Sequence, residues 1–356
     1  MGGMRSSGSL VAKMRAAAIL GLGCSLRDLD PFRQNPKDEF SVGLPATAGG
    51  LDAVLIFGGD GTLHRHLGAL VRLGLPVLVV PAGSGNDFAR AIGIRSARDS
   101  RRVWQKFEEG TGKVQAIDLG LIAALESTSS EHTKKLGVAG YKATSPAGDG
   151  ASPVSTMGGS GEACDGVTDG SRAPTSQDPP ASGTSHYFAC VAGVGLDAEI
   201  ARRANRLPRW LRRSGGYAMA LPPALLRFKP SAMQVFTSDT QNGQCELRQE
   251  GPMMLAAFAN TPFYGDGMKV APEALLDDGE LDVCLVEGMN AFRLACLFPS
   301  VYSGRHLRVK GVRYFRTPSA RVQTEPPMEV YADGEFVCRT PAEFSVAQAA
   351  LGVIVP

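Results

Sequence analysis

Two glycine-rich loops, each directly following a short apolar run, constrain this chain more than any other feature. Residues 51–57 read as a buried strand and lead into Gly58-Gly-Asp-Gly-Thr62. Residues 75–80 read as a second buried strand and lead into Pro81-Ala-Gly-Ser-Gly-Asn-Asp87, where Ser84, Asn86 and Asp87 are candidates to cap a following helix. Two strand–loop–helix units in succession predict a parallel sheet, and such sheets bind ligands beyond the carboxyl ends of their strands.

The composition of both loops is typical of an anion-binding site. Glycine lets another group approach the main chain, and successive N–H groups before a helix form a concavity for phosphate. An aspartate at the centre of such a site is explained by a metal–phosphate complex. The residues expected to contact a nucleotide are Gly58, Gly59, Asp60, Gly61, Thr62, Gly83, Ser84, Gly85 and Asn86. The alternative for each loop is an ordinary βα turn without a ligand.

Length and composition are typical of a soluble globular protein with two domains. The 356 residues are 44% hydrophobic and 20% charged, and a net charge of +2 does not favour nucleic acid as a partner. The seven cysteines show no CxxC or zinc spacing, which is typical of a reducing compartment. No apolar run reaches the roughly 18 residues that a transmembrane helix needs. Residues 16–24 faintly resemble a signal peptide, but they are short and lead into charged residues, so we expect the first strand there.

The chain divides into two regions that differ in their pattern of predicted strands and helices. Strands and helices alternate over residues 14–116, whereas a mostly β region follows over 117–356 with one helical segment at about 197–213. Residues 126–185 are rich in small and polar residues, so we expect a disordered insertion at the tip of a widened hairpin. The strands expected from residue 114 onward are 114–122, 187–192, 232–237, 252–259, 281–286, 307–315, 319–324 and 328–338.

The motifs, taken together and in order, resemble the diacylglycerol kinase catalytic family, which includes sphingosine kinases and bacterial lipid kinases. The residues that carry the resemblance are Gly58-Gly-Asp-Gly-Thr-Leu63, Pro81-Ala-Gly-Ser-Gly-Asn-Asp-Phe-Ala-Arg90, Ile117-Asp-Leu-Gly120, Ala192-Gly-Val-Gly-Leu-Asp197, residues 271–283 and Asp333-Gly-Glu335. The resemblance implies an N-terminal nucleotide-binding α/β domain, similar to those of NAD kinases and phosphofructokinases, and a C-terminal β-sandwich. It also implies an active site in the cleft between these domains.

The resemblance further implies ATP and Mg²⁺ as cofactors and assigns roles to individual residues. Glu335 matches the proposed general base, and Asp60 would act through a catalytic Mg²⁺ or its waters. Ser84 and Asn86 would reach phosphate or ribose from the second loop. In bacterial members a structural Mg²⁺ is bound by the loop matching 275–280, which here implies main-chain oxygens of Leu275 and Glu280 and the carboxylate of Asp278.

The chain departs from the family pattern at its first loop and in the first glycine motif. The family usually opens with an Asn-Pro-x-Ser-Gly loop, whereas here the first strand leads into Gly21-Leu-Gly-Cys-Ser25. His64 stands where bacterial members often have Asn. Because residues two apart do not share a helix face, we do not expect His64 and His66 to form a metal site.

A basic segment at residues 200–213 is a candidate for contact with a membrane. Its arginines alternate with apolar residues that include Trp210, and a basic amphipathic helix with Trp can lie on an anionic lipid surface. The alternative is a solvated helix docked on the sandwich. With no transmembrane segment expected, these features predict a cytoplasmic protein that contacts the inner face of the membrane peripherally.

The function expected from these features is an ATP-dependent lipid kinase acting on diacylglycerol or a related single-hydroxyl lipid, with phosphatidic acid as the product. A sphingoid-base kinase and an NAD-kinase-like enzyme stay open as alternatives. Asp87, which follows Asn86, favours the diacylglycerol branch. A nucleotide- or lipid-binding regulator without catalysis is the alternative from another class, motivated by the altered loop at 21–25.

Overall fold

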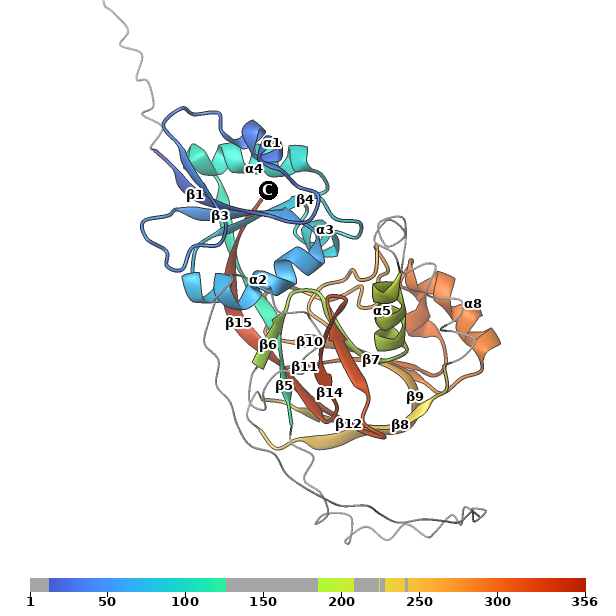
Figure 1. The fold of residues 1–356 in the computed structure, drawn as a ribbon. Helices are drawn as coiled ribbons and strands as arrows, with labels where there is room; N and C mark the ends of the chain where they lie inside the picture. Colours follow the sequence, from blue (N-terminus) through green and yellow to red (C-terminus); the bar gives the residue numbers. More distant parts are fainter. Residues whose placement is uncertain (1–12, 126–184, 208–223, 225–227, 241–242) are drawn as a thin grey trace, which may run out of the picture. The chain divides into compact units, whose positions relative to one another are not determined.

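A parallel sheet of four strands forms the N-terminal part of the fold, seen in a computed structural model that describes residues 13–125, 185–207, 224, 228–240 and 243–356 (Figure 1). The strand order is β2-β1-β3-β4, and every pair is parallel. All six positions of β3 are buried, because helices cover both faces of a parallel sheet. The strands are β1 (Arg15–Leu20), β2 (Glu39–Val42), β3 (Ala53–Gly58) and β4 (Val77–Pro81).

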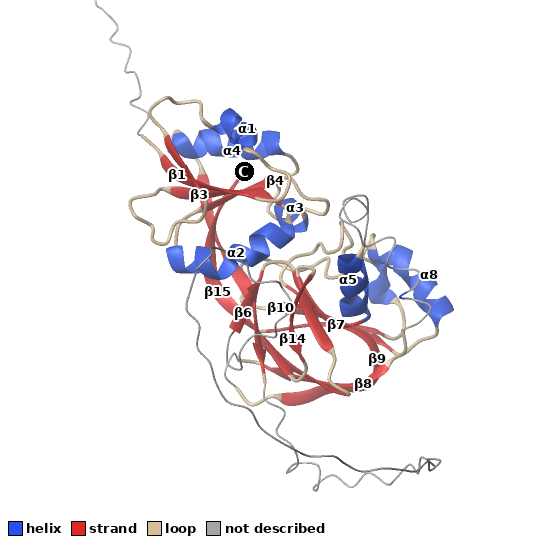
Figure 2. Cartoon of the chain, in the orientation of Figure 1, coloured by secondary structure: helices blue, strands red, loops and turns tan. Residues whose placement is uncertain are grey.

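Helices pack on both faces of this sheet, with α2 on one face and α4 on the other (Figure 2). Helix α2 buries Leu63, Leu67 and Leu70, whose spacing places them on one side of the helix, and it ends at Gly74 in the left-handed conformation. Helix α4 buries Val103 and Trp104. The helical elements are α1 (Leu26–Leu29), η1 (Asp30–Phe32), α2 (Asp60–Leu73), α3 (Asp87–Ala91) and α4 (Ala97–Glu108).

Antiparallel strands build the β-sandwich of the C-terminal part. Rings of Phe258 and Phe344 stack in its core, with centroids 4.0 Å apart. The strands are β5 (Lys113–Ala124), β6 (Ser185–Phe188), β7 (Val191–Gly195), β8 (Ser231–Ser238), β9 (Glu246–Ala259), β10 (Leu281–Glu287), β11 (Val312–Thr317), β12 (Ser319–Glu325), β13 (Glu329–Ala332), β14 (Glu335–Arg339) and β15 (Ala342–Val355).

Strands β5 and β15 are shared by the two parts of the fold. They pair with each other along most of their length, and β15 pairs with β12 at one end. At its other end β15 joins the parallel sheet, where Val353 is the register partner of Val77 in β4. The boundary expected between residues 116 and 117 therefore lies within a continuous strand.

The flanks of the expected insertion pair as a hairpin. Strands β5 and β6 are antiparallel, with Gly120 opposite Phe188 and Ala123 opposite Ser185. The insertion itself, expected at 126–185, lies outside the described residues except for Ser185. Within the described ranges, no helix is long and apolar enough to cross a membrane.

Several expectations for the C-terminal part are wrong in their details. The strand expected at 328–338 is two strands, β13 and β14, joined by a turn at Asp333 and Gly334, and β15 was not among the expected strands. Among the described residues of this part, α8 (Ala291–Val301) is helical in addition to α5 (Leu196–Arg206), although the sequence predicted only one helical segment there. Residues 307–315 were expected as one strand, but β11 begins only at Val312 because η2 (Arg305–Arg308) precedes it. Gly304 and Gly311 have positive φ and bracket the turn that separates helix from strand.

The sandwich core makes Gly120 intolerant of a side chain. A Cβ at Gly120 would lie 2.0 Å from Cζ of Phe188, whose ring is fully buried. We expect Gly120→Ala to lower the free energy of unfolding by about 1–3 kcal/mol, because the core must shift to admit it. Denaturant titration measures this change.

Gly68→Ala in α2 is the matched control. The nearest atom to a Cβ there is 3.6 Å away in the flexible Arg72 side chain, so we expect stabilisation of about 0.5–1 kcal/mol. Equal unfolding midpoints for the two variants would contradict this account of the core.

Candidate active site

The two glycine loops lie against each other, main chain to main chain. A Cβ on Gly83 would lie 2.6 Å from Cα of Gly59, and one on Gly59 would lie 2.9 Å from Cα of Gly83. Neither position therefore has room for a side chain. At the end of β3, Thr62 folds back so closely that a Cβ on Gly58 would lie 2.5 Å from its Oγ1. The structure thus brings the two predicted loops together, as the parallel sheet requires.

The second loop is closed by its own asparagine. Asn86 has a φ of +54°, its Oδ1 accepts the N–H of Gly83 at 2.9 Å, and its Nδ2 donates to the Gly83 carbonyl at 2.8 Å. These bonds use the side chain of Asn86 to hold the loop shape. Ser84 is exposed in this loop.

Asp60 joins the first loop to the second. Its Oδ2 accepts the N–H of Asp87 and its Oδ1 accepts that of Phe88, both at 3.0 Å. Burial raises the pKa of Asp60, and these two N–H donors act in the opposite direction. Each carboxylate oxygen keeps a further lone pair that is able to accept another hydrogen bond.

Asp87 is a site residue for which the sequence indicated a possible helix cap and a resemblance to the diacylglycerol branch, but no contact at the site. Its side chain is buried, its Oδ2 accepts the N–H of Asp266 at 2.9 Å, and its Oδ1 accepts that of Gly267 at 2.9 Å. Arg90 forms an ion pair with Oδ1 at 2.6 Å. Burial, reinforced by the nearby charge of Asp60, raises the pKa of Asp87 to about 6. Asp87 therefore links the second glycine loop to the segment around residue 266.

Asp333 anchors the turn that carries Glu335. Its carboxylate accepts the N–H groups of Ala189 and Cys190, both at 2.8 Å, and lies 3.0 Å from Nδ1 of His64 in α2. Asp333 itself has a φ of +50°. His64, which the sequence singled out only as a departure from the family pattern, is thus a partner of the turn.

Glu335 lies beside the first turn of α2. A Cβ on Gly61 would be 3.3 Å from its Oε1, and Nη2 of Arg65 donates to the same oxygen at 3.3 Å. The Glu335 side chain is 30% exposed, so it remains open to a reactant. Two motifs that are far apart in the sequence, the first glycine loop and the Asp-Gly-Glu turn, therefore meet in space.

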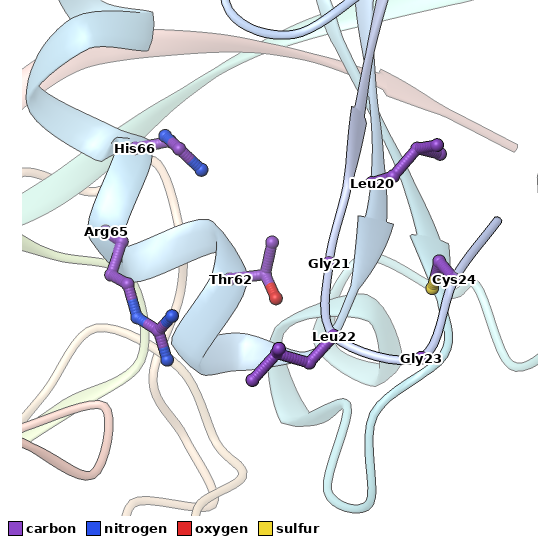
Figure 3. A pocket seen from close by; sticks show the side chains of 8 residues that line it. All are labelled: Leu20, Gly21, Leu22, Gly23, Cys24, Thr62, Arg65 and His66. Atoms are coloured by element: carbon purple, nitrogen blue, oxygen red, sulfur yellow. The ribbon is translucent and has the colours of Figure 1, made fainter. Parts of the chain in front are cut away.

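A hollow of about 430 Å³ lies next to this meeting point. Residues 20–24 line one side, and Thr62, Arg65 and His66 of α2 line the other (Figure 3). Figure 3 shows the side chains of Thr62 and His66 projecting from α2 toward the strand that carries Leu20 and Gly21. The atypical first loop is thus part of the same site, and Arg65 borders both the hollow and Glu335.

Asp118 anchors the loop at 275–280 through two hydrogen bonds. The carboxylate of Asp118 accepts the N–H of Gly279 at 2.8 Å, and its own N–H donates to the Leu276 carbonyl at 2.6 Å. Leu275 is exposed, and the N–H of Glu280 bonds to Oδ1 of Asp278 at 3.1 Å.

One oxygen of this loop lacks a hydrogen-bond partner. Oδ2 of Asp278 is buried without a donor, and its nearest cation is the Arg316 guanidinium at 3.9 Å. The described residues contain no cluster of three or more His, Cys, Asp or Glu side chains able to hold a metal. A single carboxylate with main-chain oxygens is a different donor set, and the buried, unpaired Oδ2 of Asp278 fits it.

Comparison with known proteins identifies the family. Residues 30–122 match the model of the diacylglycerol kinase catalytic domain, and residues 190–355 match that of the YegS C-terminal NAD kinase beta sandwich-like domain. The chain thus carries a diacylglycerol kinase catalytic domain followed by a YegS-type C-terminal domain. It is 29% identical over 311 residues to the diacylglycerol kinase of Mycobacterium tuberculosis, which covers 87% of this chain and 79% of that protein.

More distant members of this kinase family resemble the chain over a similar extent. The diacylglycerol kinase of Bacillus subtilis is 21% identical over 310 residues, covering 86% of this chain and 78% of that protein. A crystal structure of a diacylglycerol kinase from Bacillus anthracis aligns with a TM-score of 0.55 at 14% identity, over 97% of each chain. The structural likeness supports the expected fold of a nucleotide-binding α/β domain and a β-sandwich.

In this kinase-family fold, the buried Asp87 predicts an unusual pH dependence of stability. The folded protein binds the Asp87 proton more tightly than an unfolded chain, because its pKa rises from 3.8 to about 6. The stabilisation from this proton is complete below about pH 4 and is lost as the pH rises through about 6. We expect Asp87→Asn to flatten the free energy of unfolding over that interval, as measured by denaturant titration at several pH values.

Asp277→Asn provides the control, because Asp277 is exposed on the surface. It should leave the pH dependence as it is in the parent protein. A slope between pH 4 and 6 that is unchanged in Asp87→Asn would assign the titration to another group.

Proposed function

We propose that the protein is an ATP-dependent lipid kinase that transfers the γ-phosphate to the hydroxyl of diacylglycerol or a related lipid, with phosphatidic acid as the product. The observation that carries the proposal is the position of Glu335 beside Gly61, where a proton acceptor faces a phosphate-type loop. Relatives named diacylglycerol kinase support the choice of lipid.

The nucleotide would bind through the two glycine loops. Helix α2 begins directly at the first loop, and the positive end of its dipole favours a negative group there. Asp60 and Asn86 hold the loops in place through the bonds described above. Phosphoryl transfer depends mainly on such positioning and on neutralisation of charge. Thr62 and Arg65 border the hollow. They are proposed to contact phosphate or the part of the nucleotide that lies nearest to residues 20–24.

Glu335 would accept the proton of the lipid hydroxyl as the hydroxyl oxygen attacks the γ-phosphate. Asp333 fixes the turn through three main-chain N–H groups and His64, so the carboxylate of Glu335 is held in place before the lipid arrives. Arg65 donates to the same carboxylate, which keeps it oriented toward α2.

Mg²⁺ is proposed at two places. Oδ2 of Asp278, with main-chain oxygens of Leu275 and Glu280, would hold a structural ion in the 275–280 loop. The remaining lone pairs of Asp60 would meet water of the ion that accompanies ATP. When bound, Mg²⁺ supplies positive charge that neutralises phosphate and carboxylate oxygens.

Replacement of Glu335 tests the proposed base. We expect Glu335→Gln to lower kcat by about 10²–10⁴-fold, because the amide cannot accept the hydroxyl proton. Its melting temperature should match that of the parent, since the side chain is partly exposed. Transfer of label from γ-labelled ATP to a panel of diacylglycerol, sphingosine, NAD and sugar phosphate measures both turnover and substrate.

Glu246→Gln, which changes an exposed glutamate of β9, is the matched control and should retain full turnover. Near-normal activity of Glu335→Gln would refute its role as base. If only NAD or only sphingosine became labelled, that compound and not diacylglycerol would be the phosphate acceptor. ATP binding without label transfer to any acceptor would favour the non-catalytic alternative.

The proposed structural Mg²⁺ can be tested without an activity assay. An ion that binds the folded state raises the melting temperature, so we expect millimolar MgCl₂ to stabilise the parent protein. Asp278→Asn should lose most of this shift, whereas the neighbouring Asp277→Asn should keep it. Equal Mg²⁺-dependent shifts in the two variants would place the ion elsewhere.

A further inference from the structure

Helix α8 is apolar on its outer face as well as on its inner face. Leu294 and Leu297 are buried and pack in one cluster with Ile200 of α5. The opposite side presents Phe292, which is 77% exposed, together with three exposed neighbours of the same face. These neighbours are Ala295, Cys296 and Pro299. A surface helix in water normally turns a polar face outward, so this outer face indicates contact with an apolar medium.

The surroundings of α8 are strongly basic. Residues 288–324 contain no aspartate or glutamate. Four cationic side chains in and beside α8 and η2 are exposed and, within the described ranges, have no carboxylate partner: Arg293, Arg305, Arg308 and Lys310. An apolar stripe beside unpaired positive charge complements a membrane that carries anionic headgroups.

Helix α5, where the sequence predicted the membrane contact, differs in both respects. Glu199 forms ion pairs with Arg202 and Arg203, each at 2.5 Å, and Glu329 lies 3.9 Å from Arg202, so most of this positive charge is balanced locally and only Arg206 of α5 is exposed without an ion pair among the described residues. Ile200 and Ala204 are buried rather than exposed. Residues 208–213 of the predicted segment lie outside the described residues. Figure 1 shows α5 and α8 side by side, so the expected region is adjacent to the surface favoured here.

We propose that α8 and η2 form a docking surface for an anionic phospholipid bilayer. Eleven helical residues extend about 16 Å, too short to span the hydrocarbon core, so α8 would lie in the plane of the interface. A second copy of this chain fits less well, because a symmetric contact would bring the same positive charges together.

This surface is connected to the candidate active site through one short segment. The N–H of Lys269 donates to the Val301 carbonyl at 3.1 Å, and Nε2 of His306 lies 3.1 Å from the Val270 carbonyl. The same segment holds Asp266 and Gly267, whose N–H groups Asp87 accepts. Docking would therefore place the rim of the second glycine loop near the lipid surface. This inference rests on the proposed lipid kinase function.

Vesicle binding by the full chain tests the surface. The vesicles contain phosphatidylcholine alone or with phosphatidylglycerol, and carry no diacylglycerol. We expect the parent to sediment with anionic vesicles at low salt and to dissociate at high salt. The double variant Arg305→Glu/Arg308→Glu should lower the partition constant by about tenfold or more. Phe292→Asp should also lower it, because it removes the apolar anchor.

Arg98→Glu/Arg101→Glu on α4 is the matched control, since both arginines are exposed and their reversal changes the net charge equally. Equal losses in the two double variants would overturn the proposal in favour of a nonspecific charge effect. Binding that ignores phosphatidylglycerol and salt would also overturn it. A dimer in sedimentation velocity that Phe292→Asp dissociates, with vesicle binding unchanged, would assign the face to a second copy.

Activity separates this inference from the proposed function. With a short-chain diacylglycerol dispersed as monomers, Arg305→Glu/Arg308→Glu should keep parental turnover, whereas with vesicle-embedded diacylglycerol it should lose at least about tenfold. Vesicle binding without phosphorylation of any lipid would support the docking surface and refute the lipid kinase. Equal turnover of parent and variant on anionic vesicles would refute the docking surface alone.

Discussion

Hydrogen bonds from main-chain N–H groups to three buried or partly buried carboxylates organise the candidate site. Asp60 holds the second glycine loop, Asp87 holds the segment at 266–267, and Asp333 holds the turn before Glu335. A hydrogen bond to a charged group contributes about 1.5–3 kcal/mol, roughly twice a neutral one. Apolar packing cannot hold loops that form a polar site. These hydrogen bonds therefore fix the loops of the candidate site.

The close packing of the two loops explains why they are rich in glycine for reasons besides phosphate. Gly59 and Gly83 approach each other too closely for any side chain, and Asn86 closes its loop through Gly83. The glycine pattern thus meets a demand for close main-chain packing, whether or not a phosphate is bound. A replacement at either glycine would disturb the loops before any ligand arrived, so loss of activity there would not by itself identify a phosphate contact.

Much of the fold was predictable where the pattern was strong and local. The first glycine loop starts α2 as expected, and β3 and β4 lie where the apolar runs at 51–57 and 75–80 predicted buried strands. Helix α8 was missed, because an apolar segment among strands is ambiguous between helix and strand. The role of Asp87 was missed for another reason, since its partners Asp266 and Gly267 lie far away in the sequence.

The sequence by itself determined the family, the two-part architecture and the motifs that meet at the site, because local patterns of glycine, charge and apolar periodicity record them. Only the tertiary structure decided which groups touch. It placed the Glu335 carboxylate beside Gly61 and the His64 ring within hydrogen-bond distance of Asp333. It also left the apolar outer face of α8 exposed. These outcomes depend on how strands from distant parts of the chain pair, and β15 returning to β4 is the clearest example. Such pairing is a property of the whole packed fold and not of any local segment.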